Sequence, residues 1–126
     1  MRVTCGVDII EIDRIKDSIE DIGEKFLKKV FTDKEIEYCE SRKGQRYQHY
    51  AGRFAAKEAA FKAISSNLND KYSVNWKDFE VINDKQGRPK INITNIDTSK
   101  IESIDISISH CKSYATANVV VLYKER

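Results

Sequence analysis

The chain has 126 residues, of which 40% are hydrophobic and 33% are charged, with 22 basic and 20 acidic side chains. This length and composition exclude wholesale disorder and a second independent domain, so we expect one domain over residues 1–126. The longest apolar run, Val119–Tyr123, falls far short of the roughly 20 residues of a membrane span. The sequence has neither a secretory signal nor a cysteine framework, so we expect a cytoplasmic protein.

The N-terminal part of the sequence predicts one strand and two short helices. Alternating valines and isoleucines predict a strand over residues 3–12, in which Asp8 lies on the face opposite the apolar side chains. Isoleucines at helical spacing predict a helix that Asp13 caps and Gly23 ends, followed by a second brief helix over residues 24–30. Because Asp is depleted in strands, Asp8 requires a compensating partner.

The middle of the sequence predicts two further helices. Thr32 and Glu35 form a capping-box pattern, which predicts a helix from Asp33 to about Ser41. A run rich in alanine predicts the longest helix over residues 45–66, because alanine has high helix propensity and allows close packing.

The C-terminal part predicts β structure. Turn-prone residues 83–89 separate two candidate strands, 76–82 and 90–96, and together they predict a hairpin. Alternating isoleucines predict a half-buried strand over residues 104–109, with residues 114–123 as its antiparallel partner. Helices in the first half and strands in the second favour an α+β fold, with an antiparallel sheet packed against the long helix.

A net charge of +2 hides an uneven distribution along the chain. The segment from Ser41 to Ser66 holds six basic residues and a single acid, Glu58, which leaves the rest of the chain net acidic. A local cationic field attracts anions. The ordinary alternative is a solvated helix face with scattered lysines and arginines.

A few side chains in this pattern suggest chemistry. Glu58 and Lys62 are four residues apart, so both project from one face of the long helix. A hard cation such as Mg²⁺ would satisfy Asp8 and Glu58 together while it holds substrate phosphates. The ordinary alternatives are a surface Glu58–Lys62 ion pair and an Asp8 that accepts backbone hydrogen bonds at a bend after Gly6. His110 ends a strand, a place suited to phosphate or proton contact or to a simple hydrogen bond.

Five segments taken together resemble holo-acyl-carrier-protein synthase, the small single-domain type of 4′-phosphopantetheinyl transferase. They are GVDIIEIDRI at residues 6–15, FTDKE at 31–35, GRFAAKEAAFKA at 52–63, NDKQGRP at 83–89 and ISISH at 106–110. The segments follow one another in the family's order and span nearly the whole chain.

The resemblance implies transfer of 4′-phosphopantetheine from coenzyme A to a serine of apo acyl carrier protein, with release of adenosine 3′,5′-bisphosphate, in support of fatty acid biosynthesis. It also implies a requirement for Mg²⁺ and an α+β homotrimer with active sites between subunits. No nucleic acid or membrane is expected as a partner.

The resemblance also implies roles for individual residues. Asp8 and Glu58 become Mg²⁺ ligands, and Lys62 becomes an electrostatic clamp on the pyrophosphate. Arg53 and His110 become contacts to the nucleotide phosphates, and Arg46 is a weaker candidate of the same kind. Either Glu58 or a water on the metal accepts the serine proton, so the expected catalytic set is Glu58, Lys62 and His110.

Docking of an acidic carrier protein is expected near Arg14, which matches a family position. Acids dilute that surface, so Lys25, Lys28 and Lys29 become candidates for steering the carrier. Two residues depart from the family pattern in the turn after His110, where Cys111 and Ser113 stand in place of a hydroxyl and an acid.

Two other classes of protein remain as alternatives. A small nucleic-acid-binding module would use the basic segment and its aromatic residues for phosphate contact and base stacking, although Asp8 and Glu58 would repel a polyanion. A non-catalytic interaction subunit would give no reason for an acid in the first strand.

Overall fold

The computed structural model describes residues 1–68 and 73–125. In these ranges the helices are α1 (Ile12–Ile22), α2 (Glu24–Val30), α3 (Asp33–Ser41) and α4 (Arg46–Ile64), with 3₁₀ turns at Lys43–Gln45 (η1), Ser65–Asn67 (η2) and Trp76–Asp78 (η4). The strands are β1 (Arg2–Glu11), β2 (Phe79–Asn83), β3 (Pro89–Ile93), β4 (Ile101–His110) and β5 (Tyr114–Tyr123). Within the described ranges, none of the helices has both the length and the apolar character needed to cross a membrane.

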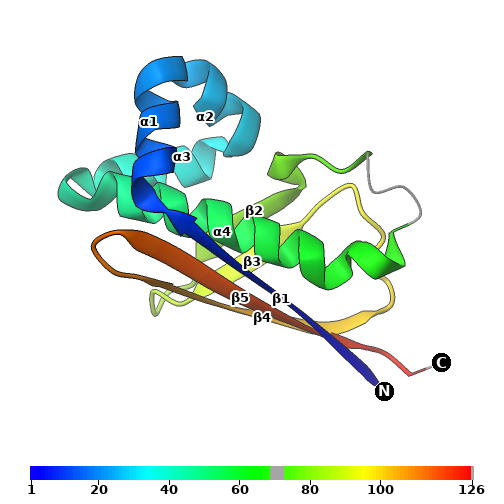
Figure 1. The fold of residues 1–126 in the computed structure, drawn as a ribbon. Coiled ribbons are helices and arrows are strands. Elements are labelled where there is room, and N and C mark those ends of the chain that lie inside the picture. Colours follow the sequence, from blue (N-terminus) through cyan, green and yellow to red (C-terminus); the bar gives the residue numbers. More distant parts are fainter. Residues whose placement is uncertain (69–72, 126) are drawn as a thin grey trace.

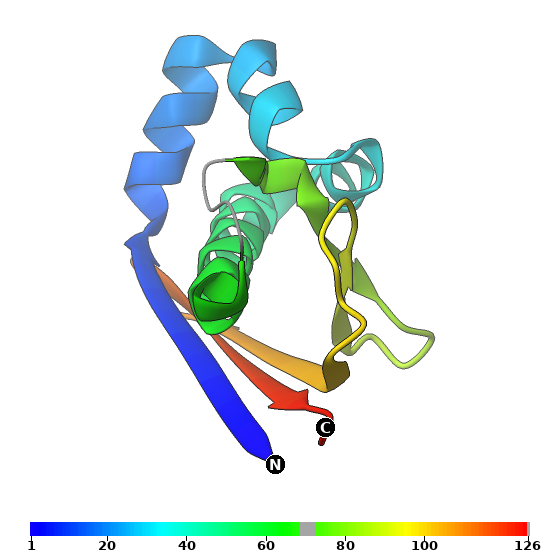
Figure 2. The ribbon, with the colours of Figure 1, turned by 90° about the vertical axis from the view of Figure 1, so that its right-hand side faces the viewer.

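The strands form two antiparallel sheets on either side of α4. One sheet has the order β1-β5-β4, and the other is the β2-β3 hairpin. Figure 2 shows α4 nearly end-on, with β1 on one side of it and the hairpin on the other. The long helix is therefore the centre of the molecule, and the predicted α+β arrangement of an antiparallel sheet on a long helix is confirmed.

Small residues allow α4 to lie very close to β1. A Cβ atom built on Gly6 would lie 1.9 Å from the carbonyl oxygen of Ala59, so only glycine fits at this crossing. The alanines along α4 are fully buried between the two sheets, together with Val119 and Val121 of β5. This contact places the inward face of β1, which carries Asp8, directly beside α4.

The helices α1, α2 and α3 cover the N-terminal end of α4, as Figure 1 shows. Phe31 and Tyr50 lie at the centre of this second core, with ring centroids 5.0 Å apart and no solvent exposure. The predicted capping box is confirmed, because the Thr32 hydroxyl accepts the N–H of Glu35 and the Glu35 carboxylate accepts the N–H of Thr32.

Two local predictions were wrong. Asp13 does not cap α1, because β1 runs directly into the helix and the N–H of Ile12 donates instead to the carbonyl of Ser113 at 2.9 Å. Residues 76–78 form a 3₁₀ turn rather than the start of a strand, because Asn75 and Asp78 cap it reciprocally. Of the loop predicted over residues 67–75, residues 69–72 lie outside the described part of the chain.

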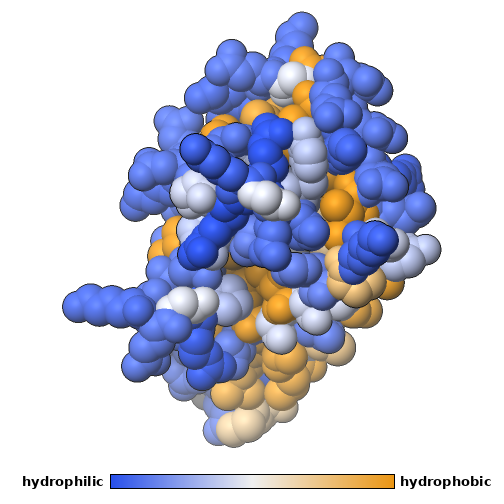
Figure 3. All heavy atoms as spheres, turned by 90° about the vertical axis from the view of Figure 1, so that its left-hand side faces the viewer, coloured by the Kyte–Doolittle hydropathy of each residue, from blue (hydrophilic) through white to orange (hydrophobic). Residues whose placement is uncertain are grey.

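The apolar face of β1 points away from α4. Val3, Val7 and Ile9 are 60%, 55% and 66% exposed, and Val120 of the neighbouring strand β5 is also exposed. Figure 3 shows hydrophobic side chains gathered at the sheet side of the molecule, below a helical end where hydrophilic side chains dominate. A monomer thus leaves a line of apolar side chains along β1 in water, which is unusual unless another surface covers it.

Candidate active site

Asp8, Glu58 and Lys62 meet where β1 crosses α4. Lys62 Nζ donates to Asp8 Oδ1 at 3.1 Å and to the carbonyl oxygen of Val7 at 3.0 Å. Glu58 lies one helical turn before Lys62 on the same face of α4. The simple Glu58–Lys62 surface pair is not formed, since the lysine bonds to β1 instead.

The electrostatics of this group are unbalanced by one negative charge. Burial raises the pKa of Glu58 above its ordinary value, the charge of Asp8 raises it further, and Lys62 opposes both effects. The positive charge of Lys62 is thus opposed by two carboxylates, those of Asp8 and Glu58. The arrangement favours an additional positive charge near Glu58.

The donors fit a magnesium ion that also binds a substrate. In the described ranges there is no cluster of three or more acidic, histidine or cysteine side chains able to hold a metal. Mg²⁺ commonly binds through only one or two carboxylates and fills its other positions with water and substrate phosphates. Asp8 and Glu58 supply such a pair of hard oxygen ligands, and burial together with the charge of Asp8 raises the pKa of Glu58.

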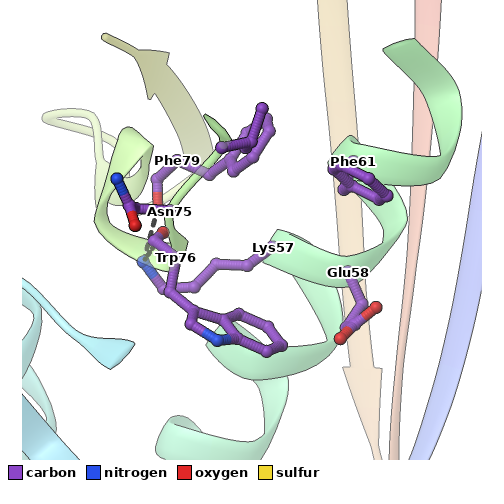
Figure 4. Close-up of a pocket in the computed structure, with 7 residues that line it drawn as sticks. Lys57, Glu58, Phe61, Asn75, Trp76 and Phe79 are labelled. Atoms are coloured by element: carbon purple, nitrogen blue, oxygen red, sulfur yellow. Dashed lines mark hydrogen bonds between the residues drawn. The ribbon is translucent and has the colours of Figure 1, made fainter. Parts of the chain in front are cut away.

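Glu58 lies between two cavities. One, of about 580 Å³, is lined by Asp8, Glu58, Arg14 and Phe54 among others, and so joins the acidic pair to α1. The other, of about 250 Å³, is apolar and lies between Glu58, Phe61 and the Trp76 turn (Figure 4). A ligand at Glu58 therefore has polar surroundings on one side and apolar surroundings on the other.

Arg53 belongs to a second cluster. Its side chain is only 4% exposed, its Nη2 donates to Asn83 Oδ1 at 2.6 Å, and its guanidinium lies 4.1 Å from the centre of the Tyr38 ring. Its Nε is buried and has no hydrogen-bond partner in the described part of the protein. No carboxylate forms a salt bridge with Arg53 among the described residues, so no acid of these ranges neutralises its charge directly.

His110 joins this second cluster through a residue that the sequence analysis missed. The ring centroids of His110 and His49 are 6.0 Å apart, and His49 also contacts Tyr38 at 5.5 Å. Burial lowers the pKa of His49, and the nearby charges of Arg53, His110 and Arg42 lower it further. The signal was present in the sequence, since His49 precedes Arg53 by four residues and shares its helix face.

The structure keeps the two clusters apart. Arg53 and Glu58 are five residues apart on α4, which places them about 140° apart around the helix axis. Asp8 reaches Lys62 from β1, whereas Arg53 is bonded to Asn83 at the end of β2, on the other side of α4 (Figure 2). The predicted site residues thus form two groups within one chain.

Arg46 is already engaged within the chain. Its guanidinium donates to both carboxylate oxygens of Glu40, at 3.0 to 3.3 Å, and lies over the ring of Tyr47. The Tyr50 hydroxyl donates to the same Glu40 carboxylate. A phosphate at Arg46 would therefore compete with an existing carboxylate.

The basic segment is not a continuous basic surface. Tyr50, Arg53 and Lys57 are all buried, and Lys57 forms an ion pair with Glu35. Of the aromatic side chains of this segment, Tyr50 is fully buried and Tyr47 and Phe54 are partly buried against the core, so they do not form an exposed row for base stacking. The structure therefore does not show the basic, aromatic surface on which the nucleic-acid-binding alternative depended.

Known proteins of the same length and fold are similar to this chain. The holo-acyl-carrier-protein synthase of Ruminiclostridium cellulolyticum is 44% identical over 126 residues, covering 96% of this chain and 92% of the relative. That of Protochlamydia amoebophila is 44% identical over 122 residues, covering 95% and 98%.

Solved structures agree with these relatives. The ACPS–CoA complex of Chronobacterium ammoniagenes has a TM-score of 0.82 at 30% identity, covering 99% of this chain and 100% of that chain. The Helicobacter pylori holo-acyl-carrier-protein synthase in complex with coenzyme A has a TM-score of 0.81 at 29% identity, covering 94% and 99%. The family model of the 4′-phosphopantetheinyl transferase superfamily matches residues 4–119. The resemblance seen in the five sequence segments is thereby confirmed, and the chain belongs to the 4′-phosphopantetheinyl transferase superfamily.

Proposed function

We propose that this protein is a holo-acyl-carrier-protein synthase, built as one domain. It transfers 4′-phosphopantetheine from coenzyme A to a serine hydroxyl of an apo acyl carrier protein and releases adenosine 3′,5′-bisphosphate. The observation that carries the proposal is the meeting of Asp8, Glu58 and Lys62 at the crossing of β1 and α4. The names of full-length relatives, and solved relatives in complex with coenzyme A, support it.

The residues of this cluster suit a reaction at a diphosphate. Asp8 and Glu58 hold Mg²⁺, which when bound neutralises charge on the phosphates. Lys62 is half exposed and lies at hydrogen-bond distance from Asp8, so its ammonium would be close enough to bind the pyrophosphate of a substrate held at Asp8 and Glu58. Glu58 lies beside the cavity that leads to Arg14, and either its carboxylate or a water molecule held there would accept the serine proton.

The second cluster suits the nucleotide end of coenzyme A. Arg53 has a buried guanidinium with an unpartnered Nε, and His110 is an exposed donor beside His49. Charge-assisted hydrogen bonds from such groups are the strong contacts for phosphate. We assign the nucleotide phosphates to Arg53 and His110, with Arg46 contributing only if it releases Glu40.

An assembly of several copies explains both the separation of the clusters and the exposed apolar face. The outer face of β1 carries Val3, Cys5, Val7 and Ile9 along one line. Burying this face between copies would remove apolar surface from water and bring the Asp8 cluster of one subunit toward another subunit. We propose a homotrimer with active sites between subunits, as the family resemblance implies.

The carrier protein docks beside the larger cavity in this proposal. Arg14 is exposed on α1 and lines the same cavity as Asp8 and Glu58. Lys25, Lys28 and Lys29 are exposed on the neighbouring helix α2 and add positive charge to that end of the molecule. An acidic carrier is drawn to such a surface by long-range attraction.

A cytoplasmic location is consistent with the cysteines. Cys5, Cys39 and Cys111 are all free thiols, which suits a reducing compartment.

Mass spectrometry tests the activity directly. Apo acyl carrier protein incubated with enzyme, coenzyme A and Mg²⁺ should gain the mass of one phosphopantetheine on its serine. Omission of Mg²⁺ with a chelator present should abolish the gain. A carrier that stays apo with active-site residues intact and Mg²⁺ supplied would refute the proposal.

A further inference from the structure

A buried ion pair adjoins the active site without taking part in the proposed chemistry. Lys57 Nζ lies 2.7 Å from Glu35 Oε1, and both side chains are completely shielded from solvent. Lys57 directly precedes Glu58 on α4, yet Figure 4 shows its side chain directed to the segment that carries Asn75, Trp76 and Phe79, away from the carboxylate of Glu58.

Backbone groups of other segments complete the bonding of this pair. Lys57 Nζ also donates to the carbonyl oxygens of Trp76, at 3.3 Å, and of Phe79. The second carboxylate oxygen of Glu35 accepts the N–H of Val81 at 2.8 Å. A single pair of side chains therefore ties together α3, α4, the η4 turn and the start of β2.

Trp76 connects the Lys57–Glu35 pair to the surroundings of Glu58. Its indole stacks on Phe54, with ring centroids 4.7 Å apart and an interplanar angle of 28°. Phe54 precedes Glu58 by four residues and lines the larger cavity with it, while Trp76 and Glu58 both line the smaller one. The walls on both sides of Glu58 thus depend on where Lys57 holds Trp76.

A buried ion pair can fix the positions of its neighbours without adding to the stability of the fold. Replacing a buried ion pair with uncharged residues of similar size is often close to neutral for stability, because the pair must first be desolvated. Its directional bonds to four backbone groups, those of Thr32, Trp76, Phe79 and Val81, nevertheless fix geometry. We propose that Lys57 and Glu35 are positioning residues of the active site, which hold the Trp76 turn against α4 so that the Phe54–Trp76 stack fixes the surroundings of Glu58. This inference rests on the proposed function for its kinetic readout.

The test removes both charges together. Lys57→Met alone leaves the carboxylate of Glu35 buried and unpaired, which should destabilise the fold strongly. The double variant Lys57→Met/Glu35→Gln leaves no buried charge, so it should lose less Tm than Lys57→Met, although one amide oxygen then replaces the two carboxylate oxygens that accept the N–H groups of Thr32 and Val81. Its kcat should still fall by about 10-fold to 100-fold through misplacement of the site, with the KM for coenzyme A within about twofold.

A fluorescence measurement reports on position independently of activity. Trp76 is the only tryptophan in the chain, so its emission and its quenching by acrylamide describe this turn alone. In the double variant the emission should shift to longer wavelength and quenching should increase. Lys77→Met is the matched control, because Lys77 is an exposed lysine of the same turn, and it should change neither kcat nor fluorescence.

The outcomes distinguish the two proposals. A wild-type enzyme that makes no holo carrier refutes the proposed function, whatever Trp76 does. An active wild type combined with a double variant of normal kcat, or with unchanged Trp76 quenching, refutes the positioning role. Loss of activity that disappears when kcat is measured per folded molecule, well below the Tm of the double variant, also refutes it, because the pair would then act through stability.

Discussion

The half-buried carboxylate of Glu58 has an unfavourable environment in the protein alone. Burial and the charge of Asp8 raise the pKa of Glu58 in the folded protein. Between the ordinary pKa and the raised pKa, Glu58 is therefore more protonated in the folded state than in the unfolded state. The free energy of unfolding therefore falls as the pH rises through this window, and the penalty is complete once the pH exceeds the raised pKa. The carboxylate that we propose as a Mg²⁺ ligand is therefore held at a cost to stability.

Glu58→Gln should separate stability from activity. Without Mg²⁺ or nucleotide, the variant should have a higher Tm than wild type at pH 7.5, and the two should converge below the ordinary carboxyl pKa. Its turnover should drop at least ~100-fold, because the amide cannot replace a ligating carboxylate. Thermal unfolding across pH, with carrier modification measured in parallel, checks both effects; a variant that is less stable than wild type at pH 7.5 would contradict the electrostatic account.

His49 should report nucleotide binding through its titration. The free protein lowers its pKa below 6.5 through burial and through the charges of Arg53, His110 and Arg42, while Tyr38 contributes an aromatic edge. A bound phosphate compensates those charges and should raise the pKa of His49. Affinity for adenosine 3′,5′-bisphosphate should then decrease as the pH rises from the free to the bound pKa.

NMR can follow this histidine directly. The chain has two histidines, and His49→Gln assigns their signals by elimination. Titration with and without the bisphosphate should show the pKa of His49 moving upward on binding. An identical pKa of His49 with and without the bisphosphate would contradict the assignment of a nucleotide phosphate to the Arg53 cluster.

At the scale of elements, the crossing of β1 over α4 decides whether the acidic pair forms. The Gly6 backbone lies so close to α4 that a methyl group would overlap the carbonyl of Ala59 and press on the N–H of Ala63. Asp8 lies two residues along the same strand. Any displacement of β1 therefore moves Asp8 away from Lys62.

Gly6→Ala should consequently damage both the fold and the site. Overpacking of this kind costs about 1–3 kcal/mol or more, so the Tm should fall clearly. Specific activity per folded molecule should fall as well, because the Asp8–Lys62 contact is lengthened. Gly44→Ala is the matched control, since no atom lies within 4 Å of its Cβ position, and it should preserve the Tm and activity. Equal Tm values for the two variants would contradict this expectation, because they would show that the methyl group at position 6 is accommodated without strain.

Local signals in the sequence predicted most elements but not their relative placement. The capping box at Thr32 predicted the start of α3 because it depends only on nearby groups. The η4 turn was missed although Asn75 and Asp78 have capping spacing, since the apolar Trp76 and Phe79 beside them suggested a strand. The meeting of Asp8 with Lys62 joins residues 54 positions apart, so only packing through Gly6 brings them together.

The whole molecule presents two clusters of polar side chains on opposite sides of α4, which we propose as the two half-sites of an active site. Asp8, Glu58 and Lys62 face the β1 side, whereas Arg53 and His110 lie with His49 near the hairpin and the end of β4. In a cyclic trimer, the acidic cluster of one subunit can meet the Arg53–His110 cluster of its neighbour, and the two together form one active site. Sedimentation should accordingly give the mass of three chains.

Mixed trimers test whether each site uses two subunits. Asp8→Ala and His110→Ala should each abolish carrier modification when assembled alone. If the two clusters belong to different subunits at each site, random mixing of equal amounts should restore about one quarter of the sites, because one neighbour must have an intact acidic cluster and the other an intact basic cluster. Mixtures of Asp8→Ala with Glu58→Ala should stay inactive, because every subunit then lacks the same half-site. Sites contained within one chain would give no recovery in either mixture, and the exposed apolar face of β1 would then require a different role.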